Sequence, residues 1–220
     1  MKWVYIVAGI ALFVKMLVVP NPKADWTDTA IVQLIVEESG VTNAVSGILF
    51  RNRLYDTIFE VVVFTISIMG ANFLLANEKP STRVYQFTDE PSIVLARLGA
   101  TIAALVGIEL AIRGHLSPGG GFAAGVAGGT AIGLIAITSS PEWMQGIYQR
   151  WKAAIWEKIS VLIFIVLAVM TLVGIEFPHG QLGELVSGGA IPLLNILVAI
   201  KVALGSWAVV LIFIRYRGLL

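Results

Sequence analysis

The stretch that decides the fold is RGHLSPGGGFAAGVAGG, residues 113–129, which lies between two apolar segments of helix length. Glycine loses more conformational freedom on folding than any other residue, so this density is expected where backbones must approach one another closely in a membrane. Pro118 precedes the glycines, at a position suited to the start of a helix. The stretch therefore predicts a helix that begins near Gly119 and packs tightly against a neighbour.

The composition indicates a membrane protein. Of the 220 residues, 57% are hydrophobic and 13% are charged, whereas a soluble domain carries about 25% charged residues. The net charge of +1 argues against nucleic acid as a partner. The chain has no cysteine, which excludes disulfides and thiolate-held iron–sulfur or zinc sites, and it has only two histidines. We therefore predict no catalytic centre, no cofactor and no metal site within this chain.

Six segments approach the ~20 mostly apolar residues that a membrane-spanning helix needs. They are residues 3–19, 56–76, 93–112, 119–138, 159–175 and 190–214. Prolines stand at or just beyond the ends of most segments, where they do little harm. No alternation typical of strands persists at useful length. The sequence predicts an all-α, polytopic membrane protein with about six transmembrane helices, the first of them a retained anchor and not a signal peptide.

A polar linker at residues 77–90 divides the chain into a two-helix segment, residues 1–90, and a four-helix domain, residues 91–220. Before the linker, residues 29–36 are amphipathic and predict either a helix on the membrane surface or a short buried helix. With six spans both termini share one side, and that side carries more basic residues. The positive-inside rule then predicts a protein of the cell membrane with both termini in the cytoplasm.

Ionisable groups inside apolar spans are the candidate functional residues, because each costs about 2.5–3.5 kcal/mol at the bilayer centre on insertion scales. Asp56 and Glu60 share one helix face and could relay a cation, although an acidic first turn also favours the helix dipole. Glu109 could hold a cation or pair with Arg113 one turn later. Lys201 lies about eleven residues into the last span, which is ~16 Å along a helix, so it should face protein or water.

Other residues have mainly structural interpretations. Glycines at four-residue steps form a small-residue stripe for helix contact, namely Gly121, Gly125, Gly129 and Gly133. His115 is expected to be a hydrogen-bonded structural residue. Pro192 and Asn195 lie in the last span, where a proline frees a carbonyl that polar groups or water must satisfy.

Two ordered motifs stand out in the second half of the chain. They are GHLSPGGGF, residues 114–122, which contains His115 and Pro118, and SGGAIPLLNILVAIKVALG, residues 187–205, which contains Pro192 and Asn195. They resemble the B-type subunit of the Mrp-type multisubunit sodium/proton antiporters, which is a four-span membrane protein, and the resemblance covers residues 92–220. Leu116 replaces the asparagine that usually follows the histidine.

A second resemblance lies upstream, in TNAVSGILFRNRLYDTIFE, residues 42–60. It is similar to the C-terminal segment of the large A-type subunit of these antiporters, with Asp56 and Glu60 on its acidic pattern and Arg51 where another acidic residue is expected. An A-type segment before a B-type domain resembles the Mrp-like modules of archaeal membrane-bound hydrogenases and sulfane sulfur reductases. The resemblance implies hydrophobic antiporter-module subunits and lipid as partners, sodium in transit, and iron–sulfur or nickel–iron centres only in partner subunits.

These observations predict a non-catalytic subunit of a cation/proton antiporter module, coupled to a respiratory redox complex, that lines or seals part of the sodium path. The alternative is a purely structural subunit, in which the glycine stripe is the main feature and polar groups pair between subunits. An autonomous small transporter is a third hypothesis, but inverted repeats of the usual kind are not visible.

Overall fold

The computed structural model describes residue 14 and residues 26–81 and 84–217. The chain divides into two compact units, residues 1–34 and 35–220. The first unit contains the start of α2 (Trp26–Ser39). Except for residue 14, the predicted span at residues 3–19 lies outside the described residues. The second unit holds the remaining helices and all the candidate functional residues.

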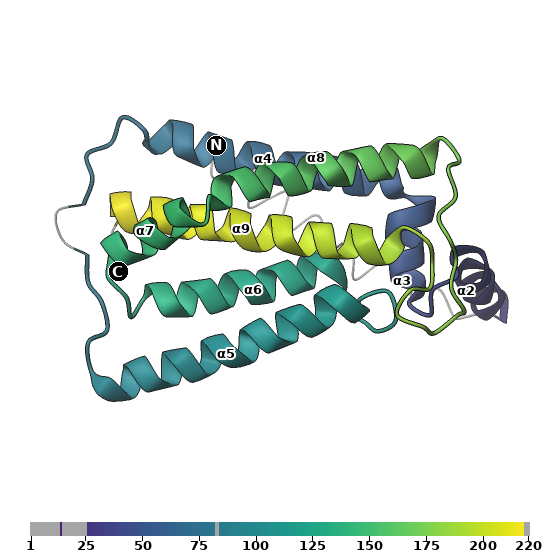
Figure 1. Cartoon of the computed structure of the whole chain (residues 1–220), viewed down its shortest axis with the longest axis horizontal. Coiled ribbons are helices and arrows are strands. Elements are labelled where there is room, and N and C mark those ends of the chain that lie inside the picture. The colour runs from purple at the N-terminus through teal and green to yellow at the C-terminus, as the bar shows by residue number, and fades with distance from the viewer. Residues whose placement is uncertain (1–13, 15–25, 82–83, 218–220) are drawn as a thin grey trace. The chain divides into compact units, whose positions relative to one another are not determined.

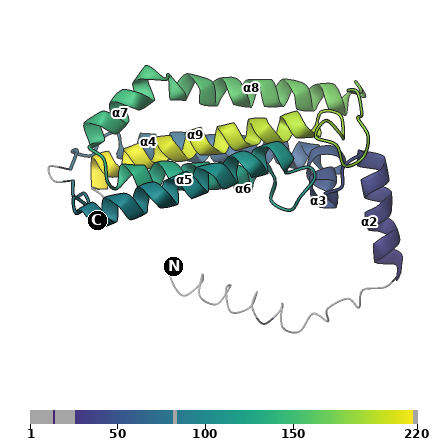
Figure 2. The ribbon, with the colours of Figure 1, turned by 60° about the horizontal axis from the view of Figure 1, so that its bottom comes forward.

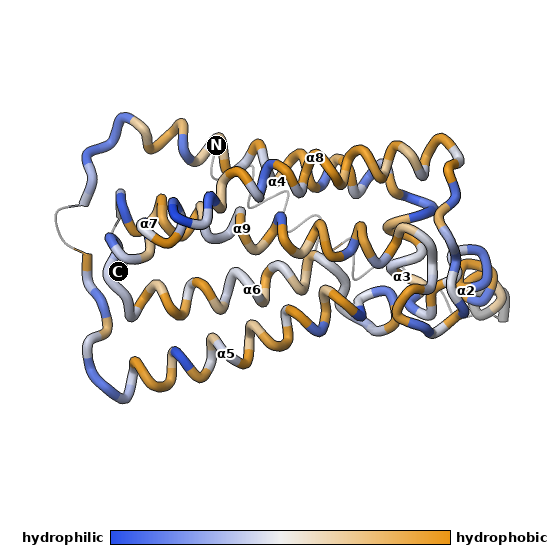
Figure 3. Tube along the Cα trace, in the orientation of Figure 1, coloured by the Kyte–Doolittle hydropathy of each residue, from blue (hydrophilic) through white to orange (hydrophobic). Residues whose placement is uncertain are grey.

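All the regular secondary structure in the described part of the second unit is helical. Its elements are α3 (Ala44–Gly47), a π-helical turn η1 (Ile48–Asn52), α4 (Leu54–Leu75), α5 (Glu90–Arg113), α6 (Gly120–Ala136), α7 (Pro141–Arg150), α8 (Ala153–Leu172) and α9 (Ile191–Arg217). Among the described helices α4, α5, α8 and α9 are long and apolar enough to cross a membrane, and α6 is a shorter apolar helix. Figure 3 shows that these helices are mainly hydrophobic. The prediction of an all-α polytopic membrane protein is confirmed.

The largest difference from the predicted spans is at α8. The sequence placed this span at residues 159–175, whereas α8 runs Ala153–Leu172 and follows a separate helix, α7. Ser140 caps α7, because its hydroxyl accepts a hydrogen bond from the Trp143 N–H at 3.2 Å. Lys152 adopts the left-handed conformation between the two helices, with φ of 50°. The helix thus includes charged residues at its start that the apolar segment left out.

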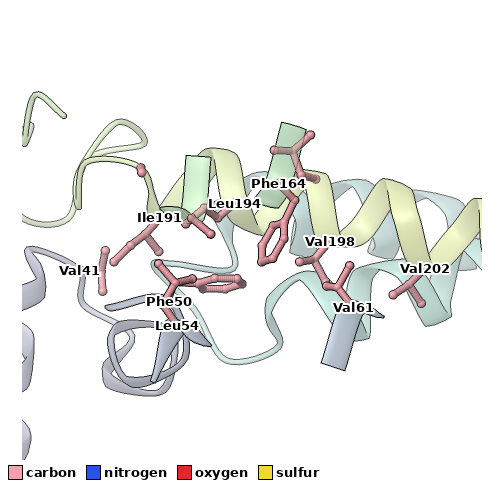
Figure 4. Close-up of a cluster of buried hydrophobic side chains, with 12 residues drawn as sticks. Val41, Phe50, Leu54, Val61, Phe164, Ile191, Leu194, Val198 and Val202 are labelled. Atoms are coloured by element: carbon pink, nitrogen blue, oxygen red, sulfur yellow. The ribbon is translucent and has the colours of Figure 1, made fainter. Parts of the chain in front are cut away.

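The central helix of the second unit is α9. In Figures 1 and 2 it lies between α8 and the pair α5–α6, and it also contacts α4 and α7. Half of its most apolar stretch is buried, against 17% in α4 and α5. Figure 4 shows the apolar cluster that joins α9 to α8 and to the segment from residue 41 to α4: Val41, Phe50, Leu54, Val61, Phe164, Ile191, Leu194, Val198 and Val202. The outer faces of α4 and α5 remain exposed.

The linker between α4 and α5 is tied to one end of the bundle. The Ser81 N–H donates to the carbonyl of Arg215 at 2.8 Å, and the Phe87 N–H donates to the carbonyl of Ile137 at 3.1 Å. These bonds connect the linker to the C-terminal ends of α9 and α6.

The glycine stripe of α6 faces α9. A Cβ placed at Gly121, Gly125 or Gly129 would come closer than 3.0 Å to an atom of α9, a separation that real Cβ atoms essentially never show. Only glycine therefore allows α6 and α9 to lie this close. At Gly133 a Cβ would meet nothing within 4 Å. The close backbone approach therefore does not extend to Gly133, although α6 still packs against α9 beyond it, where Ala136 lies in one buried cluster with Trp207 and Leu211.

Candidate functional site

Lys201 is buried on α9, with 1% of its surface exposed. It lies ten residues after the start of α9, which is about 15 Å along the helix. A lysine at this depth cannot extend its ammonium group to water, so it needs a compensating charge or must give up its proton. The side chain faces protein, as expected.

The compensating charge is Glu157 of α8. The Lys201 ammonium Nζ donates a hydrogen bond to Oε1 of Glu157, and the two groups form an ion pair. The Glu157 side chain is 9% exposed. This pair is buried, whereas the other ion pairs among the described residues lie at the surface. Removing either partner would leave an uncompensated buried charge, whereas neutralising both is often tolerated.

Glu157 is not among the functional residues expected from the sequence, because the predicted span began two residues later. A signal was nevertheless present. Ala153, Glu157, Ser160, Phe164 and Ala168 recur at steps of three and four residues, and all five are buried on one face of α8. A carboxylate inside such a stripe must face the protein interior and needs a partner there.

On the side that faces α4, aromatic and apolar side chains surround the pair. The centroid of the Phe64 ring lies 4.8 Å from Lys201 Nζ, which is within range for a cation–π interaction. One turn further along α9, Gly205 allows α4 to approach. A Cβ at Gly205 would stand 2.7 Å from atoms of both Phe64 and Ile68, and 3.6 Å from Nζ.

The other three predicted ion-path residues lie at or near the surface of this chain. Asp56 accepts a hydrogen bond from Arg53 Nε at 2.6 Å. Glu109 pairs with Arg113, with 3.4 Å between Oε1 and Nη1 and with 61% and 53% of the side chains exposed. Glu60 is exposed on α4. In the described part of the chain, no hydrogen bond or ion pair joins any of them to the buried pair.

The two motif-bearing segments meet where α5 ends and α6 begins. Asn43 Nδ2 donates to the carbonyl of Gly114 at 2.7 Å and to the carbonyl of Ser117 at 2.8 Å. Asn195 Nδ2 donates to two carbonyls in the last turn of α5, at 2.8 and 3.2 Å. The last carbonyls of a helix have no partner within it. These amides therefore satisfy the end of α5 and fix the turn into α6.

His115 is fully buried in the same turn. Its Nε2 lies 3.4 Å from the carbonyl oxygen of Glu184, in the loop before α9. Burial lowers the pKa of His115 and outweighs the opposing effect of the nearby carbonyls, so the ring is neutral near pH 7. Among the residues that the structure describes, no group of three or more side chains of the metal-binding types is gathered.

The two motif prolines lie at helix starts. Pro118 directly precedes Gly119, the residue that caps α6. Pro192 is the second residue of α9. The first N–H groups of a helix have no partner within it, so a proline there leaves no carbonyl unsatisfied. The expectation that Pro192 frees a carbonyl inside the helix is therefore wrong, because α9 begins only one residue earlier.

Comparison with known families decides the class of the chain. The model of a domain related to the MnhB subunit of Na+/H+ antiporters matches residues 91–208, which is more than half of the chain. The chain belongs to this MnhB-related family. The matched region runs from α5 into α9 and includes the glycine stripe, Glu157 and Lys201. The resemblance of the second half to the B-type antiporter subunit is thereby confirmed.

A curated relative covers nearly the whole chain. It is the probable K+/H+ antiporter A/B subunit of Rhizobium meliloti (strain 1021), 22% identical over 246 aligned positions that cover 96% of this chain. This MnhB-related chain spans only 24% of the relative's length.

Two solved structures share the fold. One is from the membrane-bound sulfane sulfur reductase, an archaeal respiratory membrane complex, with a TM-score of 0.73, 24% identity and coverage of 97% of this chain and 96% of that chain. The other is from the Mrp complex of Dietzia sp. DQ12-45-1b, with a TM-score of 0.67, 18% identity and coverage of 96% and 25%. The likeness extends over both halves of the MnhB-related chain.

Proposed function

We propose that this chain is a non-catalytic membrane subunit of a cation/proton antiporter module, and that the Lys201–Glu157 pair changes its charge state as ions move. The observation that carries the proposal is this ion pair, buried between α8 and α9 inside a domain whose family is that of an Na+/H+ antiporter subunit. Two charges taken out of water are expensive, and apolar residues of similar volume are often at least as stable. A functional reason for keeping the charges therefore has weight.

The chemistry of the pair suits an exchange of a cation for a proton. A cation beside Glu157 competes with the Lys201 ammonium for the carboxylate, because both are attracted at short range in a medium of low dielectric. The ammonium can then release its proton and become a neutral amine, which removes the repulsion with the cation. When the cation leaves, the amine takes up a proton and the pair forms again.

The wider assignment is also a proposal: the exposed apolar faces support a place in a larger membrane complex, and the likeness to a chain of the sulfane sulfur reductase supports a respiratory one. The outer faces of α4 and α5 are apolar but carry Glu60 and Glu109. Such faces suit contact with lipid and with other hydrophobic subunits of a hetero-oligomeric complex. We place the chain in a respiratory redox complex of the hydrogenase or sulfur reductase type, with sodium as the ion in transit and iron–sulfur or nickel–iron centres only in partner subunits. Both termini are assigned to the cytoplasm.

The test uses the assembled complex in proteoliposomes and three variants: Lys201→Met, Glu157→Gln and the double variant. Each single variant keeps one buried charge without its partner, so it is expected to assemble poorly and to lose sodium-dependent proton movement. The double variant is expected to assemble and still to move no protons. Glu38→Gln, which opens the surface pair with Arg51 and is not one of the ion-path candidates, is the control and should change neither property.

The second candidate function is a purely structural subunit. It is favoured by the pairing of Asp56, Glu109 and Lys201 within this chain and by the tight contact between α6 and α9. Under this hypothesis the double variant regains both assembly and proton movement, because only the balance of charge matters. The same three variants therefore separate the two functions.

A further inference from the structure

A cavity opens at the end of the bundle where α8 ends and α9 begins, and it has a volume of about 280 Å³. Its titratable lining residues come from two segments that lie far apart in the sequence: Arg51 from η1, and Glu176 and His179 from the loop between α8 and α9. We name this space the η1 cavity. The buried pair lies elsewhere, because Lys201 is ten residues further along α9, and no step of the proposed function uses the cavity.

The η1 cavity lies where the membrane-spanning part of the bundle ends. The apolar sequence of α8 continues to Ile175 and is followed directly by Glu176, and the apolar sequence of α9 begins at Ala190. Leu172 and Ile175 line the cavity and are 50% and 46% exposed, so they extend its wall onto the outer surface at the end of α8. In a bilayer, the boundary between apolar and charged side chains lies at the level of the lipid headgroups.

The guanidinium of Arg51 has unused hydrogen-bond donors. Its ion pair with Glu38 is long, with 3.8 Å between Nε and Oε1, which exceeds the length of a hydrogen bond. In the described part of the chain, no group accepts a hydrogen bond from this guanidinium, and Arg51 forms no ion pair with Glu176. A guanidinium binds phosphate through two parallel, charge-assisted hydrogen bonds, so Arg51 suits a phosphate group.

The imidazole of His179 lies against two glycines at the wall of the cavity. A Cβ at Gly40 would stand 3.3 Å from its Nδ1 atom, and a Cβ at Gly189 would stand 3.2 Å from its Cε1 atom. Both glycines have positive φ, 67° and 61°, so a larger residue at either position would be strained and would also crowd the ring. An imidazole donates a hydrogen bond in its neutral form as well as in its charged form. His179 therefore offers the cavity a second donor.

We propose that the η1 cavity binds the headgroup of a membrane phospholipid, with the lipid phosphate on Arg51 and His179. The carboxylate of Glu176 repels a ligand that carries only negative charge, so the headgroup must also supply a hydrogen-bond donor. Phosphatidylglycerol meets both needs, because a hydroxyl of its headgroup donates to Glu176 while its acyl chains lie along Leu172 and Ile175. The bound lipid joins η1 to the loop between α8 and α9. This inference is independent of the exchange chemistry proposed for the buried pair.

The test uses the purified complex after removal of lipid, and phosphatidylglycerol that carries a photoreactive diazirine near the start of one acyl chain. Labelling of residues 172–177, mapped by mass spectrometry, reports binding at the cavity. Unlabelled phosphatidylglycerol should compete for the site. Phosphatidylcholine has no headgroup donor for Glu176, and glycerol 3-phosphate has no acyl chain, so each should need a concentration about tenfold higher or more.

Two variants test the role of the guanidinium. Arg51→Gln should weaken the labelling about tenfold or more, because it removes charge-assisted hydrogen bonds to the phosphate. Arg53→Gln is the matched control, because Arg53 pairs with Asp56 and does not line the cavity, and it should label like the wild type.

Equal labelling of the two variants, or equal competition by phosphatidylcholine, means unspecific lipid contact and overturns the proposal. Equal competition by glycerol 3-phosphate assigns the cavity to a free phosphate compound, and absence of labelling means that a partner subunit covers it. Either result also overturns the lipid site. If Arg51→Gln fails to assemble, the competition series in the wild-type complex still decides.

Discussion

Replacing single glycines of α6 by alanine tests the contact between α6 and α9 quantitatively. In Gly125→Ala the new methyl carbon would come closer than 3.0 Å to the side chain of Val202 on α9. Ordinary carbon–carbon contacts are about 3.5–4.0 Å. The two helices must therefore separate or shift, and this disturbs the packing that each of them already makes. Gly133→Ala is the matched control, because nothing lies within 4 Å of the new atom.

The magnitude follows from two opposing contributions to the free energy of unfolding. Overpacking of a well-packed contact costs about 1–3 kcal/mol. Alanine gains about 1 kcal/mol over glycine in helix propensity, and this gain is common to both positions. Gly125→Ala is therefore expected to be less stable than Gly133→Ala by about 1–3 kcal/mol. Gly133→Ala itself should match or exceed the wild-type stability.

The assay heats the purified complex in detergent to a series of temperatures. At each temperature it measures the fraction of this chain that still elutes with its partners. Gly125→Ala should lower the midpoint temperature, and Gly133→Ala should not. Equal midpoints for the two variants would refute the account of the glycine stripe as a close helix contact.

Three further outcomes are expected. Asn195→Leu leaves two carbonyls at the end of α5 unsatisfied, so it should lower the free energy of unfolding by about 1–3 kcal/mol, measured by urea or heat titration. Burial holds the pKa of His115 below its ordinary value of about 6.5, so the unfolded chain binds a proton at this residue more readily than the folded chain does. The melting temperature should therefore fall as the pH is lowered through about 6.5 and beyond. His115→Gln should remove that part of the pH dependence. Lys201→Met alone should destabilise the fold by about 3–5 kcal/mol, and addition of Glu157→Gln should recover most of this, whereas purely additive losses would contradict a coupled pair.

The sequence predicts the burial of Lys201 but not its partner, and the reason is physical. A lysine in the middle of an apolar segment has no route to water, so its burial follows from its position alone. Glu157 stands near the start of α8, where charged residues usually mark the end of a span. Within the bundle its charge is compensated by Lys201, 44 positions later. Such a contact depends on how α8 packs against α9, which local composition does not determine.

The acidic residues of α4 show a different limit. The four-residue spacing places Asp56 and Glu60 on neighbouring parts of one helix face, but the periodicity does not say which way that face points. In a membrane both the interior of a bundle and the contact with another protein chain can accept polar groups. In this chain Glu60 points outward, and Asp56 pairs with Arg53 at the start of the helix.

The most direct test of the central claim is the infrared difference spectrum of the assembled complex on addition of sodium. If the Lys201–Glu157 pair changes charge as the ion binds, sodium must alter the carboxyl and carboxylate bands of Glu157. The account predicts a sodium-dependent band that disappears in Glu157→Gln and persists in Glu38→Gln. A spectrum that sodium leaves unchanged, or a band that survives in Glu157→Gln, would contradict it.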